Sequence, residues 1–205
     1  MTSQFPITPF DQHWELVVNG WTRYSPWLNR LGEVLAGYAP EIWAVVFLLL
    51  WFWPPLKQNR ARRAVVYAVV AGVLALAINV VLGHILPYRP RPFVYEPRLI
   101  HQLLPHKKDT SFPSDHAAGS FAFAVGLFFA GASDGILALI FAALVSIARV
   151  FVGLHWPTDV IAGAVIGVIS GLVVLALRGY LEWLVQALFR LFGMKPERTY
   201  RRHWS

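Results

Sequence analysis

Ionisable side chains gather at two short stretches that border strongly apolar segments. One stretch runs from Arg149 to Asp159 and contains His155, and the other ends in Asp115 and His116. Charged groups at the edge of a membrane are energetically costly, so by default they mark a functional site. Arginine can hold the oxygens of an anion, one histidine can attack while another donates a proton, and aspartate can orient the attacking ring. This combination favours chemistry on phosphate.

The spacing within the longer stretch suggests how the histidines work. His155 lies in a turn, and Asp159 follows four residues later. A carboxylate bonded to one imidazole nitrogen fixes the tautomer and leaves the other nitrogen as nucleophile or base. We therefore take His155, His116 and Asp159 as candidate catalytic residues. A structural Asp–His cap and a zinc site made by the same three residues are the alternatives, although the nearby arginines would repel a divalent cation.

Two further features suit an anion. Residues 88–92 hold Arg89 and Arg91 between prolines, and a guanidinium group binds two phosphate oxygens at once. We expect both arginines to face the membrane surface, with a snorkelling pair at a helix end as the alternative. Pro113 and Ser114 resemble a helix start, where free backbone N–H groups and the positive dipole end attract anions.

The composition excludes several classes of protein. Hydrophobic residues make up 57% of the 205 residues and charged residues only 14%, whereas soluble domains carry about 25% charged residues. The chain is thus predicted to be an integral membrane protein. The absence of cysteine excludes disulfides and thiolate chemistry. The net charge of +7 gathers in loops and tail beside apolar segments, which indicates membrane topology rather than nucleic-acid binding. The first residues do not resemble a cleaved signal peptide.

The apolar segments predict a helical bundle. A spanning helix needs about 20 mostly apolar residues, and five candidates lie at about residues 40–53, 64–86, 116–132, 135–154 and 157–177. The first is long enough only if residues 35–38 join it. Glycines at 163, 167 and 171 predict a smooth face for helix packing. Residues 8–37 predict an amphipathic interfacial segment, with a sixth, imperfect span as the alternative. The expected fold is an all-α integral membrane bundle of five or six transmembrane helices.

Basic residues set the expected orientation and the division of the chain. We expect an interfacial N-terminal segment over 1–38, a transmembrane catalytic domain over 39–178 and a basic tail over 179–205. Loop 54–63 and the tail are rich in lysine and arginine, so both should be cytoplasmic. Counting spans from there places 87–115 and 154–157 together on the extracytoplasmic face.

The polar stretches together resemble the three signature motifs of the type 2 phosphatidic acid phosphatase superfamily. The residues that match those motifs are Arg91 and Pro92, then Pro113, Ser114 and His116, then Arg149, His155 and Asp159. Three positions depart from the family pattern: His84 stands in place of lysine, Asp115 in place of glycine and Ala148 in place of serine. The resemblance covers about residues 64–178, and the joint match is highly specific.

The resemblance implies a role for each matching residue. His155 would attack phosphorus and form a phosphohistidine, Asp159 would orient it, and His116 would protonate the leaving oxygen. Contacts to the substrate are implied for Arg91, Arg149 and the Ser114 region, and His84 is a candidate replacement for the missing lysine. The resemblance implies no metal and no other cofactor.

A closer similarity narrows the expected substrate. Residues 91–94, 101–106 and 109–116 resemble the bacitracin-resistance undecaprenyl-diphosphate phosphatases of bacteria, in which Asp115 and the loss of the lysine are usual. This implies an enzyme of the bacterial plasma membrane that removes the terminal phosphate of undecaprenyl diphosphate. The candidate contacts for the second phosphate are Arg98, His101, His106, Lys107 and Lys108, although juxtamembrane basic residues also attract anionic headgroups. We expect a lipid diphosphate or monophosphate substrate, no nucleic acid and no obligate protein partner.

Two other functions stay open from the sequence. One is a phosphatidylglycerophosphate or broad-specificity lipid phosphate phosphatase. The other is a membrane transporter or channel, whose charged residues should be spread through the depth of the bilayer. The middles of the spans, at 65–78 and 160–176, carry no charge, which disfavours the second alternative.

Overall fold

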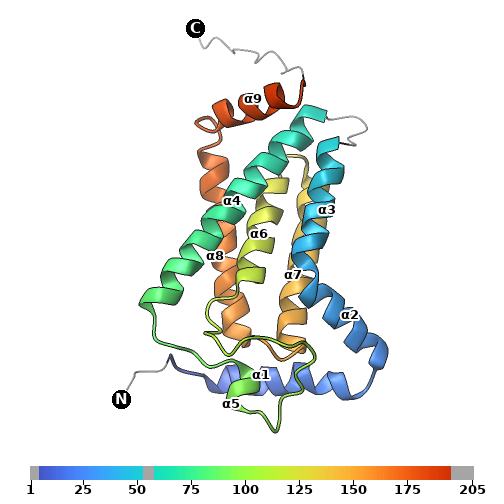
Figure 1. Ribbon diagram of the computed structural model, residues 1–205, viewed down its shortest axis with the longest axis vertical. Helices are drawn as coiled ribbons and strands as arrows, with labels where there is room; N and C mark the ends of the chain where they lie inside the picture. Colours follow the sequence, from blue (N-terminus) through green and yellow to red (C-terminus); the bar gives the residue numbers. More distant parts are fainter. Residues whose placement is uncertain (1–4, 53–57, 195–205) are drawn as a thin grey trace.

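The computed structural model describes residues 5–52 and 58–194, which form helices joined by loops and no strands. In chain order the helices are α1 (Pro9–Gly20), the short 3-10 helix η1 (Trp21–Arg23), α2 (Pro26–Gly37), α3 (Ala39–Phe52), α4 (Gln58–Ile85), α5 (Pro92–Tyr95), α6 (Asp115–Leu127), α7 (Ala132–Phe151), α8 (Pro157–Ala176) and α9 (Glu182–Leu191). Helices α3, α4, α6, α7 and α8 run alongside one another, α1 lies across one end, and α9 lies across the other (Figure 1).

The helix lengths confirm a membrane bundle. Three helices are long and apolar enough to span by themselves: Asn59–Ile85 within α4, Ala132–Phe151 (α7) and Pro157–Ala176 (α8). Helices α2 and α3 together form a further candidate span, bent by 66°. Residues 58–63, which the sequence placed in a loop, form the first turns of α4; residues 53–57 lie outside the described part, as does the tail from 195 onward.

Helix α6 is short and central, and this position recesses the site. Its 13 residues extend about 20 Å, less than the roughly 30 Å of a bilayer's hydrocarbon core. It packs between α4, α7 and α8. Its first turn, which carries His116, begins further inside the bundle than the end of α7 and the start of α8 (Figure 1).

Small residues bring α6 and α8 together, as the four-residue glycine spacing predicted. A Cβ added at Gly163 would lie 2.5 Å from the carbonyl oxygen of Ser114, and one added at Gly167 would lie 2.3 Å from that of Ala118. Side chains larger than hydrogen would push the helices apart at both points. Because α6 and α8 both begin at the same end, this contact places the starts of the two helices side by side.

The N-terminal helix is amphipathic with its polar side facing inward. Thr8 and Asp11 form a capping box that starts α1, with each side chain satisfying a backbone N–H. Asp11, Glu15 and Asn19 lie four residues apart and are buried. The exposed side chains of α1 include His13 and four large apolar residues, Phe10, Trp14, Leu16 and Val17. The predicted amphipathic segment is thus present, and its polar face contacts the protein.

Candidate active site

The polar patches of the sequence meet at one cavity of about 390 Å³ at the α1 end of the bundle. Its wall comes from the end of α4, the loop before α6, the first turn of α6, the end of α7 and the turn before α8. Five of the residues proposed to act on substrate line it: His84, Arg91, His116, Arg149 and His155. A cavity of this size lies within the range of small-molecule sites.

Hydrogen bonds determine which nitrogen of His155 can react. Its Nδ1 lies 2.9 Å from the carbonyl oxygen of Ser111, and a carbonyl only accepts, so Nδ1 carries the proton. The lone pair then resides on Nε2, which lies 3.1 Å from Nη1 of Arg91 and 3.2 Å from Nη2 of Arg149. Two guanidinium donors therefore surround this lone pair.

Backbone carbonyls hold these two arginines in place. Nη1 of Arg91 also donates to the oxygen of Leu154 at 2.9 Å, and Nη2 donates to that of Thr110 at 3.2 Å. Nη1 of Arg149 donates to the oxygen of Ala36 at 3.0 Å. Both side chains are about 95% buried. The guanidinium groups are fixed before substrate arrives, which is the arrangement that favours electrostatic stabilisation of a phosphoryl group.

Asp159 supports His155 without a direct hydrogen bond. Its Oδ2 accepts from the backbone N–H of Trp156 at 2.8 Å and lies 3.6 Å from Nδ1 of His155. The direct acceptor for Nδ1 is the Ser111 carbonyl, which sequence reasoning could not identify because any residue carries a carbonyl. Asp159 remains close enough to stabilise positive charge on the ring.

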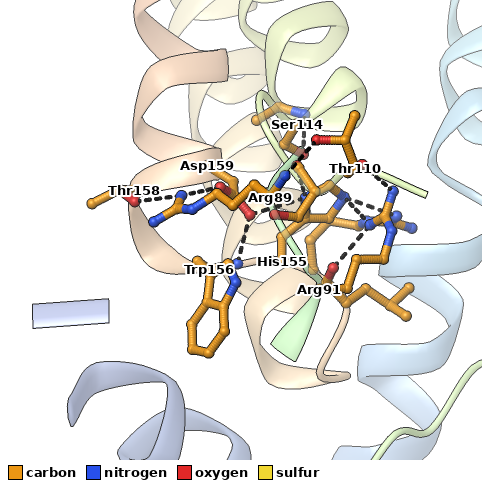
Figure 2. A network of polar contacts seen from close by, with 12 residues as sticks. Arg89, Arg91, Thr110, Ser114, His155, Trp156, Thr158 and Asp159 are labelled. Atoms are coloured by element: carbon orange, nitrogen blue, oxygen red, sulfur yellow. Dashed lines mark hydrogen bonds and ion pairs between the residues drawn. The ribbon is translucent and has the colours of Figure 1, made fainter. Parts of the chain in front are cut away.

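Arg89 does not face the membrane surface, contrary to the expectation from its neighbouring prolines. It is 1% exposed and forms ion pairs with Asp159 and with Asp11 of α1. Figure 2 shows its guanidinium group directed toward Asp159 and Thr158, whereas Arg91 extends toward His155. The two arginines of one motif thus serve different places: Arg91 lines the cavity and Arg89 is buried behind it.

The start of α6 forms another side of the cavity. Ser114 is the N-cap residue, and its buried side chain accepts from the backbone N–H of Ala117, so this hydroxyl caps the helix. Its own N–H donates to the carbonyl oxygen of Asp159 at 3.1 Å. Asp115 and His116 follow and line the cavity, where the positive end of the helix dipole favours an anion.

Of the five loop residues expected to contact a second phosphate, His106 lines the cavity and the other four do not. Lys107 and Lys108 are exposed, while the members of this loop that line the cavity include His106 and Asp109. Nε of Arg91 donates to Asp109 at 2.8 Å. His84 lines the rim, with its Nδ1 2.7 Å from the carbonyl oxygen of Val80. The loop therefore presents a histidine to the cavity and its lysines to the surroundings.

Burial and positive neighbours keep His155 neutral. Burial lowers the pKa of His155 well below its ordinary value, and the charges of Arg149 and Arg91 lower it further. The pKa of His106 is lowered by burial and by the same two arginines. A neutral imidazole is the reactive form, so His155 holds a free lone pair at neutral pH.

The zinc alternative does not fit these contacts. Nε2 of His155 faces two guanidinium groups, and Asp159 is paired with Arg89. Among the described residues, no group of three or more histidine, cysteine, aspartate or glutamate side chains is arranged to hold a metal ion. Arg91 and Arg149 instead place two positively charged groups beside Nε2 of His155.

Sequence reasoning missed two side chains that contribute to the site. Asn79 of α4 is 4% exposed, lines the cavity and donates to Asp115 at 2.8 Å. Asn79 interrupts an otherwise apolar span, a signal that was available in the sequence. Asp11 also carried a signal, because it begins a polar series with four-residue spacing; its partner Arg89 lies 78 residues away and could not be assigned.

Comparisons with known proteins agree with this geometry. Residues 64–183 match the PAP2 superfamily. Undecaprenyl-diphosphatase BcrC of Bacillus subtilis is 29% identical over 175 residues, covering 85% of this chain and 88% of the relative. An undecaprenyl-diphosphatase of Sulfolobus acidocaldarius is 36% identical over 143 residues, covering 68% and 66%. The crystal structure of Aquifex aeolicus LpxE has the same fold, with a TM-score of 0.66 and 21% identity over 85% of this chain and 99% of that chain.

The matched region contains every residue that lines the cavity, together with all three polar patches. The sequence similarity, the fold and the arrangement of the reactive side chains therefore lead to one assignment. The chain is a membrane phosphatase that belongs to the PAP2 superfamily.

Proposed function

We propose that the protein hydrolyses undecaprenyl diphosphate to undecaprenyl phosphate and inorganic phosphate through a phosphohistidine at His155, and so recycles the carrier lipid of cell-wall synthesis. The observation that carries this proposal is the lone pair on Nε2 of His155, held between Arg91 and Arg149 at 3.1 and 3.2 Å. The relatives named undecaprenyl-diphosphatase support the choice of substrate.

The first step transfers the terminal phosphoryl group to the enzyme. Nε2 of His155 bonds to phosphorus as the bond to the bridging oxygen breaks, and the lipid monophosphate leaves. The N–H groups of Arg91 and Arg149 that lie beside the ring nitrogen then donate to the phosphoryl oxygens, where they stabilise the charge of the transition state. The ring becomes cationic, and Asp159 at 3.6 Å from Nδ1 stabilises that charge.

The second step releases inorganic phosphate. His116, which lines the same cavity, removes a proton from water as the water oxygen bonds to phosphorus and the bond to Nε2 breaks. In the first step the same residue donates a proton to the leaving oxygen. A phosphate leaving group needs this proton less than an alcohol does, so His116 matters more for lipid monophosphates than for diphosphates.

The charge distribution supports an extracytoplasmic active site in the bacterial plasma membrane. The site lies at the α1 end, and the start of α4 and helix α9 lie at the opposite end (Figure 1). Basic residues on those helices include Arg60, Arg62, Arg63 and Arg190. Because cytoplasmic ends carry the excess of lysine and arginine, the cavity faces the other side.

A phosphate-release assay on a panel of lipids tests the proposal. The purified full-length protein is compared on undecaprenyl diphosphate, undecaprenyl phosphate, phosphatidylglycerophosphate and phosphatidate, with and without excess EDTA. We expect the highest kcat/KM on undecaprenyl diphosphate and full activity with the chelator, because Arg91 and Arg149 supply the positive charge. A preference for phosphatidylglycerophosphate or phosphatidate would overturn the substrate assignment, and a loss with EDTA that zinc or magnesium restores would overturn the metal-free mechanism.

A further inference from the structure

A buried ionic network joins the N-terminal helix to the carboxylate behind His155. Arg89 contacts Asp11 of α1 with one nitrogen, Nη2, at 2.7 Å, and contacts Asp159 of α8 with the other, Nη1. Asp11 and Asp159 are fully buried and Arg89 is 1% exposed. One cation thus lies between two anions from helices that begin far apart in the sequence (Figure 2 shows the Asp159 side).

Asp11 forms hydrogen bonds within this network through both of its carboxylate oxygens. Its Oδ2 accepts from Arg89, and its Oδ1 accepts from the backbone N–H of Thr158 at 2.9 Å and from the Thr158 hydroxyl at 2.7 Å. The Thr158 hydroxyl also lies 2.8 Å from Nη1 of Arg89. Asp11 therefore fixes both the arginine that binds Asp159 and the residue that precedes Asp159 in the chain.

The orientation of the Asp159 carboxylate depends on these contacts of Asp11 with Arg89 and Thr158. Arg89 holds Oδ1 of the carboxylate, and the N–H of Trp156 holds Oδ2, the oxygen that faces Nδ1 of His155. If Arg89 moves, the carboxylate can rotate about its single bond and carry Oδ2 away from the ring. The negative charge of Asp159 would then lie further from the imidazole of His155 when that ring becomes cationic.

We infer that Asp11 is a positioning residue of the phosphatase: through Arg89 and Thr158 it holds the Asp159 carboxylate against His155, so that the interfacial helix α1 forms part of the catalytic framework. The inference rests on the proposed role of His155 as nucleophile. It assigns to α1 a function beyond seating the chain at the membrane surface.

The exposed side of α1 explains how a surface helix can serve this purpose. Phe10 and Trp14 are 48% and 46% exposed, whereas Asp11 is fully buried, and aromatic side chains are favoured at the membrane interface. The ionic network attaches the buried face of α1 to the protein, and its exposed aromatic side chains are suited to contact lipid. A helix attached by only one face would fray more readily.

The central experiment replaces Asp11 with asparagine in the full-length protein. Asparagine keeps the size and can still accept from Thr158, but it loses the charge that holds Arg89. We expect kcat to fall about tenfold, which is the size of effect seen when the hydrogen-bond partners of metal-ligating residues are changed. KM should change less than about twofold, because Arg91 and Arg149 are untouched. Asp11→Glu, which restores the charge, should recover part of the loss.

Two matched controls separate this role from general effects. Glu15→Gln makes the same acid-to-amide change one turn further along the same buried face, where both carboxylate oxygens of Glu15 lack a hydrogen-bond partner among the described residues. Glu182→Gln removes an inter-helix ion pair, with Arg63, at the other end of the bundle. Both variants should keep kcat and KM within about twofold of the wild type.

A double-mutant cycle tests the route through Asp159. If Asp11 acts by holding that carboxylate, Asp11→Asn combined with Asp159→Asn should lower kcat no further than Asp159→Asn alone. Multiplication of the two losses would show that Asp11 acts elsewhere and would overturn the inference. The inference is also overturned if Asp11→Asn lowers only the melting temperature while kcat per folded protein is unchanged, or raises KM alone.

The substrate is chosen so that the two proposals fail separately. All variants are assayed on whichever lipid phosphate of the panel the wild-type protein hydrolyses fastest. Failure of the wild type on undecaprenyl diphosphate then overturns the proposed substrate, whereas equal kcat values for the wild type and Asp11→Asn overturn the positioning role.

Discussion

The two ends of the bundle both join helices by ion pairs, but the pairs differ in burial. At the site end, Arg89 and its partners Asp11 and Asp159 are at most 1% exposed. At the opposite end, Arg63 of α4 pairs with Glu182 of α9, and these side chains are 14% and 30% exposed. The first contact is sealed from solvent, while the second remains partly solvated.

This difference shows what each end requires. Buried charges lose their hydration, so an ion pair in the interior adds little net stability compared with apolar packing, yet it is severely destabilising to break. A partly exposed pair has neither property. At the site end, burial of the Arg89 network costs hydration energy but fixes the Asp159 carboxylate beside His155. At the opposite end, the ion pair only attaches α9 to α4.

Substitution of the nucleophile should give the largest difference between a site residue and a residue outside the site. His155→Ala removes the group that bonds to phosphorus, so we expect phosphatase activity to fall at least about 10⁴-fold without loss of the folded protein. His13→Ala, which removes an exposed histidine from α1, should leave activity unchanged. Phosphate release and acid-quench trapping of labelled phosphohistidine measure both effects; full activity in His155→Ala would exclude the proposed intermediate.

Replacement of Arg89 or Arg63 with methionine compares how much the ion pairs at the two ends contribute to the free energy of unfolding. Arg89→Met leaves two buried carboxylates without their cation, so we expect the free energy of unfolding to fall by about 3–5 kcal/mol. Arg63→Met should lower it by about 1 kcal/mol or less. Denaturation in a single detergent, followed by tryptophan fluorescence, compares the variants. Equal losses would mean that the burial of the Arg89 network has no energetic consequence.

The pH dependence of stability distinguishes Glu15 from the network beside it. Burial raises the pKa of Glu15 well above its ordinary value, and the charges of Asp159 and Asp11 raise it further. A raised folded-state pKa contributes stability that is fully present below the unfolded-state pKa and is lost as the pH rises through the folded-state pKa. Glu15→Gln removes this loss, so its melting temperature should rise relative to the wild type as the pH increases above the ordinary pKa range of a glutamate. A constant gap would show that Glu15 titrates normally.

The bundle could be predicted from the sequence because its signals are local. Helix α8 begins at Pro157 and α6 begins directly after Ser114, where a proline and a capping serine indicate helix starts. The glycines of α8 contact α6 closely, as their spacing implies. The segment before the first span was harder to interpret, because its polar residues suggested contact with water whereas the fold buries them.

The division of labour between Arg89 and Arg91 could not be predicted in the same way. Both precede a proline and lie two residues apart in a loop, so the local sequence predicts the same role for each. Their roles depend on partners at sequence distances of 78 and 64 residues, Asp11 and His155. The hydrogen bond from His155 to the Ser111 carbonyl is equally hidden, since a backbone acceptor leaves no mark in the sequence.

The smallest expected effects concern the loop between the first two motifs. They test whether a diphosphate is preferred over a monophosphate because of a side chain in the cavity or because of exposed charges near it. His106 lines the cavity, whereas Lys107 and Lys108 are exposed. We expect His106→Ala to raise KM for undecaprenyl diphosphate severalfold more than for undecaprenyl phosphate, because a contact made equally in the ground and transition states acts through KM.

The double variant Lys107→Ala/Lys108→Ala should have a weaker effect that is similar on both lipids and disappears at high salt, because exposed charges act on anions over a screened distance. Measurement of KM for the two lipids at about 0.05 M and about 0.5 M salt separates the cases. If the lysine variant instead loses the diphosphate selectively at both salt concentrations, the second phosphate is bound outside the cavity by lysines that move toward it. The contribution of His106 to substrate choice would then be excluded, while the role of His155 would stand.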